Sequence, residues 1–205
     1  MKRMLYRRRF LATGLGMAVS GLVFPRARAQ AVERATGFMQ QTGSQLTAIV
    51  NGAQGAADKR RAITLILEGT VDVDGIARFC LGRFWRIATP DQQKRFLAAF
   101  HEVLVTNISS KLGEYKGVKL TVQRGRQQDD EGIVTTVVER PNNPPTSVDW
   151  VVEKPATAPK IIDVIAEGTS LRLTQRQDYA SYLTRNNNDV DALINAMKQQ
   201  TANSQ

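Results

Sequence analysis

Histidine and cysteine, the side chains that most often act as metal ligands, nucleophiles or bases, are almost absent from this chain. Its 205 residues include one histidine, His101, and one cysteine, Cys80. A single cysteine excludes an intrachain disulfide and a cysteine-based zinc site, and a single histidine excludes a pair of imidazole ligands. Cys80 stands among apolar neighbours, which is typical of a buried structural thiol. We therefore expect no catalytic residue, no metal site and no cofactor.

Acidic residues offer two weaker possibilities. Asp72 and Asp74 precede Gly75 like the start of a calcium loop, but the further ligands of such a loop are missing. Asp149 and Asp163 fall on neighbouring predicted strands and could meet in space, although solvent-facing carboxylates explain them more simply. In the alternative hypothesis of an isomerase-like or dehydratase-like enzyme on a cone-shaped fold, His101 and Asp163 are the best candidate bases.

The formal net charge of +9 suggests a nucleic-acid-binding protein until the charges are located along the chain. Residues 1–29 contain seven basic residues and no acidic one. Removing these seven from the 28 basic residues leaves 21 against 19 acidic residues, a net charge of +2 for residues 30–205. So small a net charge predicts no phosphate-tracking surface, and we expect no nucleic-acid partner.

The first 29 residues have the organisation of a signal peptide. Residues 2–9 are basic, residues 10–24 form the apolar run FLATGLGMAVSGLVF, and Ala27 and Ala29 supply the small residues before a cleavage site at Gln30. Arg7 and Arg8, followed after one residue by Phe10 and Leu11, resemble a twin-arginine export signal. We expect export to a periplasm, with a general secretory signal as the alternative. The apolar run is short for spanning a bilayer, so no stable membrane insertion is expected, and an uncleaved anchor is the alternative.

The remaining chain predicts a single domain over residues 30–200 with a frayed tail at 201–205. Helical spacing is found over residues 31–50 and 57–68, and Thr89 followed by Pro90, Asp91 and Gln92 predicts a helix start. That helix is expected to run to about Tyr115. Alternating patterns then predict four strands, at 118–124, 132–139, 146–153 and 160–167, before helices at 170–184 and 188–198.

This order of elements predicts an α+β fold in which helices pack on one face of a curved antiparallel sheet of four or slightly more strands. The long helix that begins at Pro90 carries an aromatic stripe, so it is the expected partner of that face. The apolar surface between helices and sheet is either a packed core or, if the sheet stands open as a cone, a cavity for a hydrophobic ligand.

Several segments together resemble the MlaC family of periplasmic lipid-binding proteins, also described as toluene-tolerance proteins. The first runs from Leu-Gly-Arg-Phe-Trp at residues 81–85 through Ala-Thr-Pro-Asp-Gln-Gln at 88–93 and Phe-Leu-Ala-Ala-Phe at 96–100 to Tyr115. The second comprises Val-Asp-Trp at 148–150, Lys-Ile-Ile-Asp-Val-Ile at 160–165 and Glu-Gly-Thr-Ser-Leu at 167–171. The resemblance covers residues 30–200.

The resemblance implies a non-enzymatic shuttle that carries phospholipid between an outer-membrane lipoprotein complex and an inner-membrane ABC transporter complex. The segments at residues 174–179 and 186–190 are closer to a hopanoid-associated subgroup, so a hopanoid or another apolar lipid is the alternative cargo. Transferred to this chain, the pocket for the acyl tails would be lined by Phe84, Phe96, Phe100, Leu104, Val134, Val138, Val148, Trp150, Val152, Ile162, Val164 and Leu171. Leu171 is expected to close one end of it.

Overall fold

The computed structural model describes residues 24–113 and 117–203. The elements in chain order are α1 (Phe24–Asn51), α2 (Ala56–Thr70), α3 (Val73–Leu81), the short 3₁₀ helix η1 (Gly82–Arg86), α4 (Pro90–Gly113), β1 (Lys119–Gln128), β2 (Glu131–Glu139), β3 (Thr146–Glu153), β4 (Lys160–Ala166), β5 (Thr169–Ser170), α5 (Leu171–Arg185) and α6 (Val190–Ala202). The predicted signal segment lies outside the described residues up to residue 23, and residues 24–29 begin α1. Tyr115 also lies outside them.

The strands form one open antiparallel sheet in the order β1-β2-β3-β4-β5. The predicted α+β class and antiparallel connectivity are therefore confirmed. The additional strand, β5, follows β4 through a two-residue turn in which Glu167 and Gly168 both have positive φ angles, of 52° and 79°. Such a turn matches the right-handed twist of the strands and leads the chain directly into α5.

Local capping residues start the helices where the sequence predicts. Thr89 and Gln92 form a reciprocal capping box at α4: the Gln92 backbone N–H donates to Thr89 Oγ1, and the Thr89 backbone N–H donates to Gln92 Oε1. Asp72 caps α3 by accepting from the Gly75 backbone N–H at 3.0 Å, so this carboxylate has a helix-capping role. At the other end of the chain, α6 extends to Ala202 and buries Thr201, so the expected tail at 201–205 starts too early.

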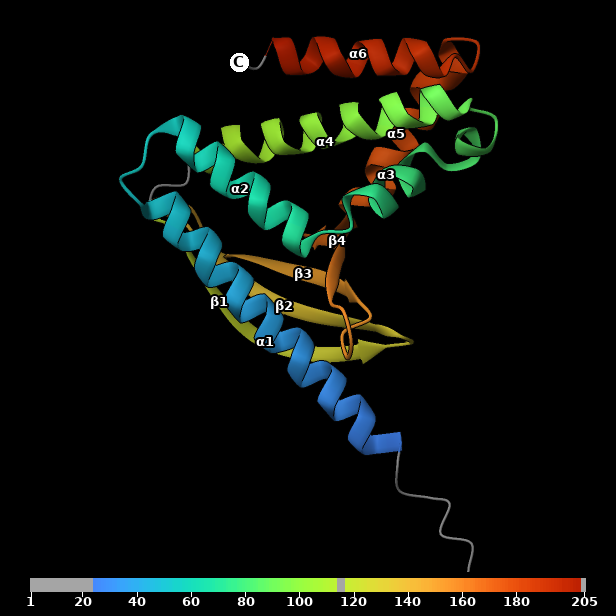
Figure 1. Cartoon of the computed structure of the whole chain (residues 1–205). Coiled ribbons are helices and arrows are strands. Elements are labelled where there is room, and N and C mark those ends of the chain that lie inside the picture. Colours follow the sequence, from blue (N-terminus) through green and yellow to red (C-terminus); the bar gives the residue numbers. More distant parts are fainter. Residues whose placement is uncertain (1–23, 114–116, 204–205) are drawn as a thin grey trace, which may run out of the picture.

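The helix that lies on the sheet is α1, not α4 as the aromatic stripe predicted. Figure 1 shows α1 running diagonally across β1 and β2, while α4 lies in a separate helical layer with α6, α2 and α3. The reason is steric, because Gly125 and Gly132 lack the side chains that would hold the helix away. A Cβ atom at Gly125 would lie 2.5 Å from Thr36 Oγ1, and one at Gly132 would lie 2.9 Å from the Ala35 Cβ.

We expect Gly125→Val to lower the free energy of unfolding by about 1–3 kcal/mol, because α1 must move away from β1 to admit the new side chain. Chemical denaturation followed by circular dichroism measures the change. Gly37→Ala is the matched control on α1, since nothing lies within 4 Å of its added Cβ. An alanine in the middle of a helix favours folding by about 0.5–1 kcal/mol over glycine. Equal denaturation midpoints for Gly125→Val and Gly37→Ala would contradict close packing at Gly125.

Candidate functional site

The most distinctive surface of the sheet is the face that α1 crosses. It is here called the inner face and is defined by Val122, Val134, Thr136, Val138, Val148, Trp150, Val152 and Val164. Val134, Trp150 and Val164 are directly paired across β2, β3 and β4 and form one apolar row. Val122, Thr136 and Val148 form the next row. The inner face therefore carries a band of apolar side chains across four strands, interrupted by one hydroxyl.

The polar atoms of this face are paired with one another. The Trp150 indole Nε1–H donates to Thr136 Oγ1 at 2.8 Å, and the Thr136 hydroxyl lies within 3.4 Å of the Val148 carbonyl oxygen. Thr136 is fully buried, whereas Trp150 is only partly buried. Because the indole N–H is already satisfied, the ring presents an apolar surface, which suits contact with hydrocarbon.

Val71 is the point at which the apolar clusters of the protein meet. It packs against the inner-face cluster of α1 and the sheet, against the helical core of α3 to α6, and against the small cluster of Ile63, Leu67 and Val105 between α2 and α4. Val71 also forms a parallel bridge to Ile161 of β4, and the Asp72 backbone N–H donates to the Ile161 carbonyl at 3.0 Å. The helical layer is thus fixed to the sheet at β4.

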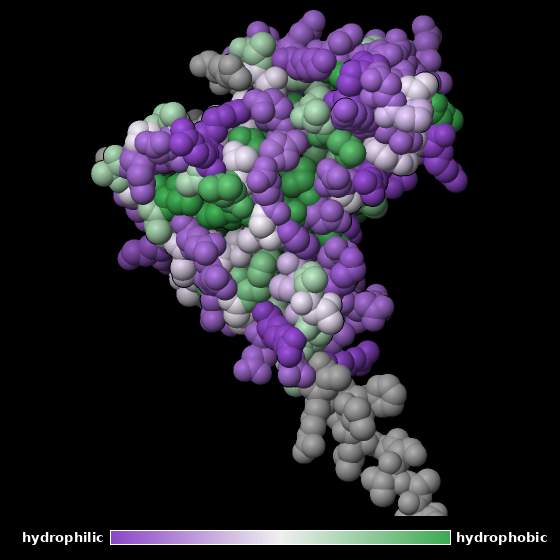
Figure 2. Space-filling model, in the orientation of Figure 1, coloured by the Kyte–Doolittle hydropathy of each residue, from purple (hydrophilic) through white to green (hydrophobic). Residues whose placement is uncertain are grey.

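Apolar surface is also exposed beside the inner face. Figure 2 shows hydrophobic residues gathered at the surface around α2, close to α1. Leu65 of α2 is 65% exposed, and its neighbour Ile66 is only partly buried. The cluster that holds α2 on α4 contains only three buried residues, so α2 is supported by a small apolar contact.

The predicted pocket residues divide into two groups in the structure. Six of the sheet residues lie together on the inner face: Val134, Val138, Val148, Trp150, Val152 and Val164. Ile162 is buried but falls at a β-bulge, because Val151 pairs with Asp163 and Val152 pairs with Ile161.

The helical residues of the predicted set belong to a different core. Phe96 and Phe100 pack against each other and against Tyr179 of α5, with ring centroids 6.0–6.4 Å apart. Phe84 is buried in the same core and Leu104 packs on it. Leu171 is 52% exposed at the first turn of α5. The stripe of α4 is buried against α5 and α6, and the sequence signal shows only that a face is buried, not by which element.

The helix that the prediction left out of the pocket is α1. Ala35 and Met39 are buried against Val134 and Val152, and Phe38 packs on the same cluster. The helical spacing of residues 31–50 predicted the helix and its apolar stripe, but that spacing carries no information about which strands the stripe covers.

The two strand carboxylates lie on the opposite face of the sheet, here called the outer face and defined by Thr135, Asp149 and Asp163. Asp149 accepts from Thr135 Oγ1 at 2.6 Å and pairs with Arg126 at 3.1 Å. Burial raises the pKa of Asp149, but these hydrogen bonds outweigh burial and hold the pKa below its ordinary value. Each carboxylate has its own donors, so the two do not form an acid–base pair.

Asp163 is the buried member and fixes the start of α5. Its carboxylate accepts from the Ser170 hydroxyl at 2.5 Å and from the Arg172 backbone N–H at 3.1 Å, and it pairs with the Arg172 guanidinium at 3.4 Å. His101, the other candidate base, lies on α4 with Nε2 3.7 Å from Glu68 of α2. Both residues therefore occupy structural contacts away from the inner face, and the enzyme hypothesis loses the observations that favoured it.

Cys80 is a buried thiol, as its apolar neighbours predicted. It is 1% exposed, donates to the Arg172 carbonyl at 3.5 Å, and has a pKa raised by burial to about 12. We expect native protein at pH 8 to react with a thiol reagent over 100-fold more slowly than urea-unfolded protein, because both access and thiolate are lacking. A spectrophotometric thiol assay tests this, and a rapid reaction of the native form would contradict the buried position.

The architecture defines a class: a small α+β protein whose distinctive surface is the apolar inner face of an open sheet beneath a helical layer. None of the described helices has the length and apolar character needed to cross a membrane. The chain belongs to the MlaC family, because the model of the MlaC protein matches residues 40–199. This match begins within the second half of α1, includes all the later elements through α5, and ends within α6.

Two known proteins extend the comparison. The toluene tolerance protein Ttg2D of Pseudomonas putida is 29% identical over 135 residues, which are 65% of this chain and 63% of that protein. The match thus spans slightly less than two thirds of the relative. A phospholipid-binding protein from Ralstonia solanacearum, solved in complex with a phospholipid, superimposes with a TM-score of 0.70 at 20% identity, covering 83% of this chain and 98% of the other. This likeness establishes a shared fold.

Proposed function

We propose that this protein is a lipid carrier that holds acyl chains against the inner face of its sheet. The observation that carries the proposal is the apolar row of Val134, Trp150 and Val164, whose one polar N–H is satisfied within the protein. Membership of the MlaC family and the common fold with a protein solved with bound phospholipid support the same conclusion.

The energetics of lipid transfer explain why such a surface suffices. Two acyl chains contain roughly 30 methylene groups, and exposing each to water costs about 0.8 kcal/mol. Moving a free lipid through water would therefore cost on the order of 24 kcal/mol. A carrier that covers the chains with an equally apolar surface brings loading and release close to balance. Such a carrier needs no catalytic residue, and net direction must come from partners.

The proposed setting is a periplasm. The protein would take lipid from, or deliver it to, an outer-membrane lipoprotein complex and an inner-membrane ABC transporter complex. The predicted cleavage before Gln30 supports this setting, because Ala31 is the first buried residue among the α1 side chains that the structure describes, from Arg28 onward, and it would remain in the mature chain. The twin-arginine-like signal at residues 7–11 supports export in the folded state.

Lipid extraction and native mass spectrometry of protein purified from its own cells test the proposal. We expect a stoichiometric complex with phospholipid. If the main extracted lipid is a hopanoid, the protein is still a lipid carrier, but its cargo is a hopanoid and not a phospholipid. Protein that carries no extractable lipid and takes up none from labelled vesicles would overturn the proposal.

A further inference from the structure

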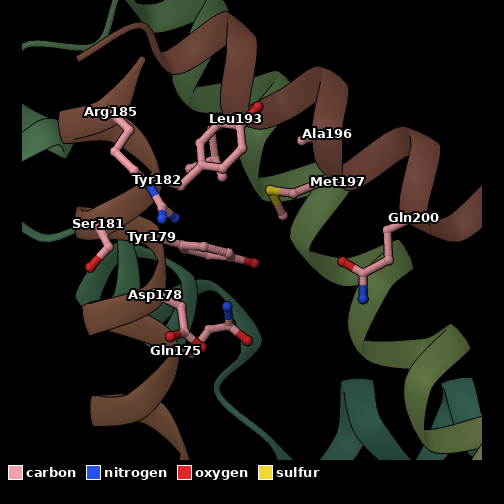
Figure 3. A pocket seen from close by; sticks show the side chains of 10 residues that line it. All are labelled: Gln175, Asp178, Tyr179, Ser181, Tyr182, Arg185, Leu193, Ala196, Met197 and Gln200. Atoms are coloured by element: carbon pink, nitrogen blue, oxygen red, sulfur yellow. The ribbon is translucent and has the colours of Figure 1, made fainter. Parts of the chain in front are cut away.

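A cavity lies between α5 and α6, and none of its lining residues belongs to the inner face. Its volume is about 340 Å³, and its apolar wall includes Leu193 and Met197 of α6 and the rings of Tyr179 and Tyr182 of α5. Figure 3 shows the ring of Tyr179 reaching from α5 toward α6, below Met197. The volume is at the lower end of the range for small-molecule sites, so the cavity suits one chain or one ring rather than a two-chain lipid.

Tyr179 brings a phenol hydroxyl to the lining of this cavity. The residue is 8% exposed, and its hydroxyl is not among the buried polar atoms of the described residues that lack a hydrogen-bond partner. Burial also raises the pKa of Tyr179, so the phenol keeps its proton. The hydroxyl of the neighbouring Tyr182 donates to the Ala192 carbonyl at 3.3 Å. A ligand that brings an acceptor oxygen into the cavity could accept a hydrogen bond from the Tyr179 hydroxyl.

Arg185 gives the cavity a positive group. Its side chain lines the cavity, and Figure 3 shows it folded back along α5 toward Tyr182. No carboxylate of the described residues lies within 4 Å of its guanidinium. The one acidic lining residue, Asp178, is seven residues earlier on α5, about 10 Å along the helix axis. The two charges are therefore separated, which leaves the guanidinium available to an anionic oxygen.

We propose that the cavity between α5 and α6 is a second ligand site, for a single-chain amphiphile with an anionic oxygen head group. The head group pairs with Arg185 and accepts from the Tyr179 hydroxyl, and the apolar part lies against Leu193 and Met197. This site is independent of the inner face and goes beyond the carrier function.

Calorimetric titration of decanoate into full-length mature protein already loaded with phospholipid tests the site. We expect saturable 1:1 binding, at least tenfold weaker binding of decanol and of decyltrimethylammonium, and loss of decanoate binding in Ala196→Phe, which fills the cavity. Tyr179→Phe and Arg185→Gln should each weaken the binding of decanoate by about tenfold, which is the effect of losing one hydrogen bond to a charged group. Lys198→Gln on α6 removes the same charge outside the cavity and should bind normally.

Three results would overturn the proposal. The first is the absence of saturable decanoate binding to the loaded protein. The second is binding that occurs only after phospholipid is removed, which would place decanoate on the inner face. The third is equal binding by wild type, Tyr179→Phe and Arg185→Gln, with circular dichroism showing that all three are folded. None of these results counts against phospholipid binding to the inner face.

Discussion

Asp163→Ala should lower the free energy of unfolding by about 3 kcal/mol, the largest effect on stability that we expect from a single polar side chain. The substitution removes the acceptor of the Ser170 hydroxyl and of the Arg172 backbone N–H, and it leaves the guanidinium of Arg172 without its carboxylate. A buried ion pair that loses one partner is costly because the remaining charge stays partly desolvated. For a domain of this size the melting temperature should fall by roughly 6–12 °C.

Asp149→Ala is the matched control, since it removes a carboxylate from the same outer face of the sheet. The Asp149 side chain is 23% exposed, against 4% for Asp163, so water can replace part of what is lost. We expect Asp149→Ala to lower the free energy of unfolding by about 1 kcal/mol. Thermal and urea unfolding of both variants provide the measurement. Equal losses at the two positions would mean that Asp163 does not anchor α5 as the contacts indicate.

Val164→Glu should reduce the lipid that co-purifies with the protein at least tenfold. Val164 ends the apolar row on the inner face, where a carboxylate would have to be desolvated against an acyl chain. Because Val164 is only partly buried, the new side chain can reach water in the lipid-free protein, and the fold should survive. Lipid phosphorus per mole of protein, measured after extraction, reports the effect.

Val137→Glu separates loss of binding from loss of folding. Val137 is also a partly buried valine, but it lies on the outer face and pairs with Thr121 and Ser147. We expect normal lipid content in this variant. If both variants lose lipid together, the effect is structural. If the Val164→Glu variant co-purifies with as much lipid as the wild type, the acyl chains do not lie on the inner face.

The phase of the strands was predictable because it is a local property. Alternate side chains of a strand point to opposite faces, so the spacing of Val134 and Val138, or of Val148, Trp150 and Val152, assigns each group to one face before any fold is known. The pairing of Val134 with Trp150 and Val164 confirms this phase. Ile162 departs from it because of the β-bulge in β4, and nothing in the run Lys-Ile-Ile-Asp marks such a bulge.

The partners of the helices were not predictable in the same way. Phe96 and Phe100 lie on a regular apolar stripe, yet they pack on Tyr179 of α5, about 80 residues later in the chain. The sheet is covered instead by α1, whose stripe is less aromatic. What favours α1 is the pair of glycines at positions 125 and 132, and their role depends on which helix lies above them.

The sequence by itself determined the class of fold, the strand order, the helix starts at Thr89 and Ser170, and the buried state of Cys80. These features follow from periodicity, capping and turn residues, whose effects extend over a few residues. Only the tertiary structure decided that α1 lies on the inner face, that Asp163 anchors α5, and that α5 and α6 line a cavity. Those outcomes depend on contacts between distant segments, for which side-chain shape and close packing select one partner among several apolar faces.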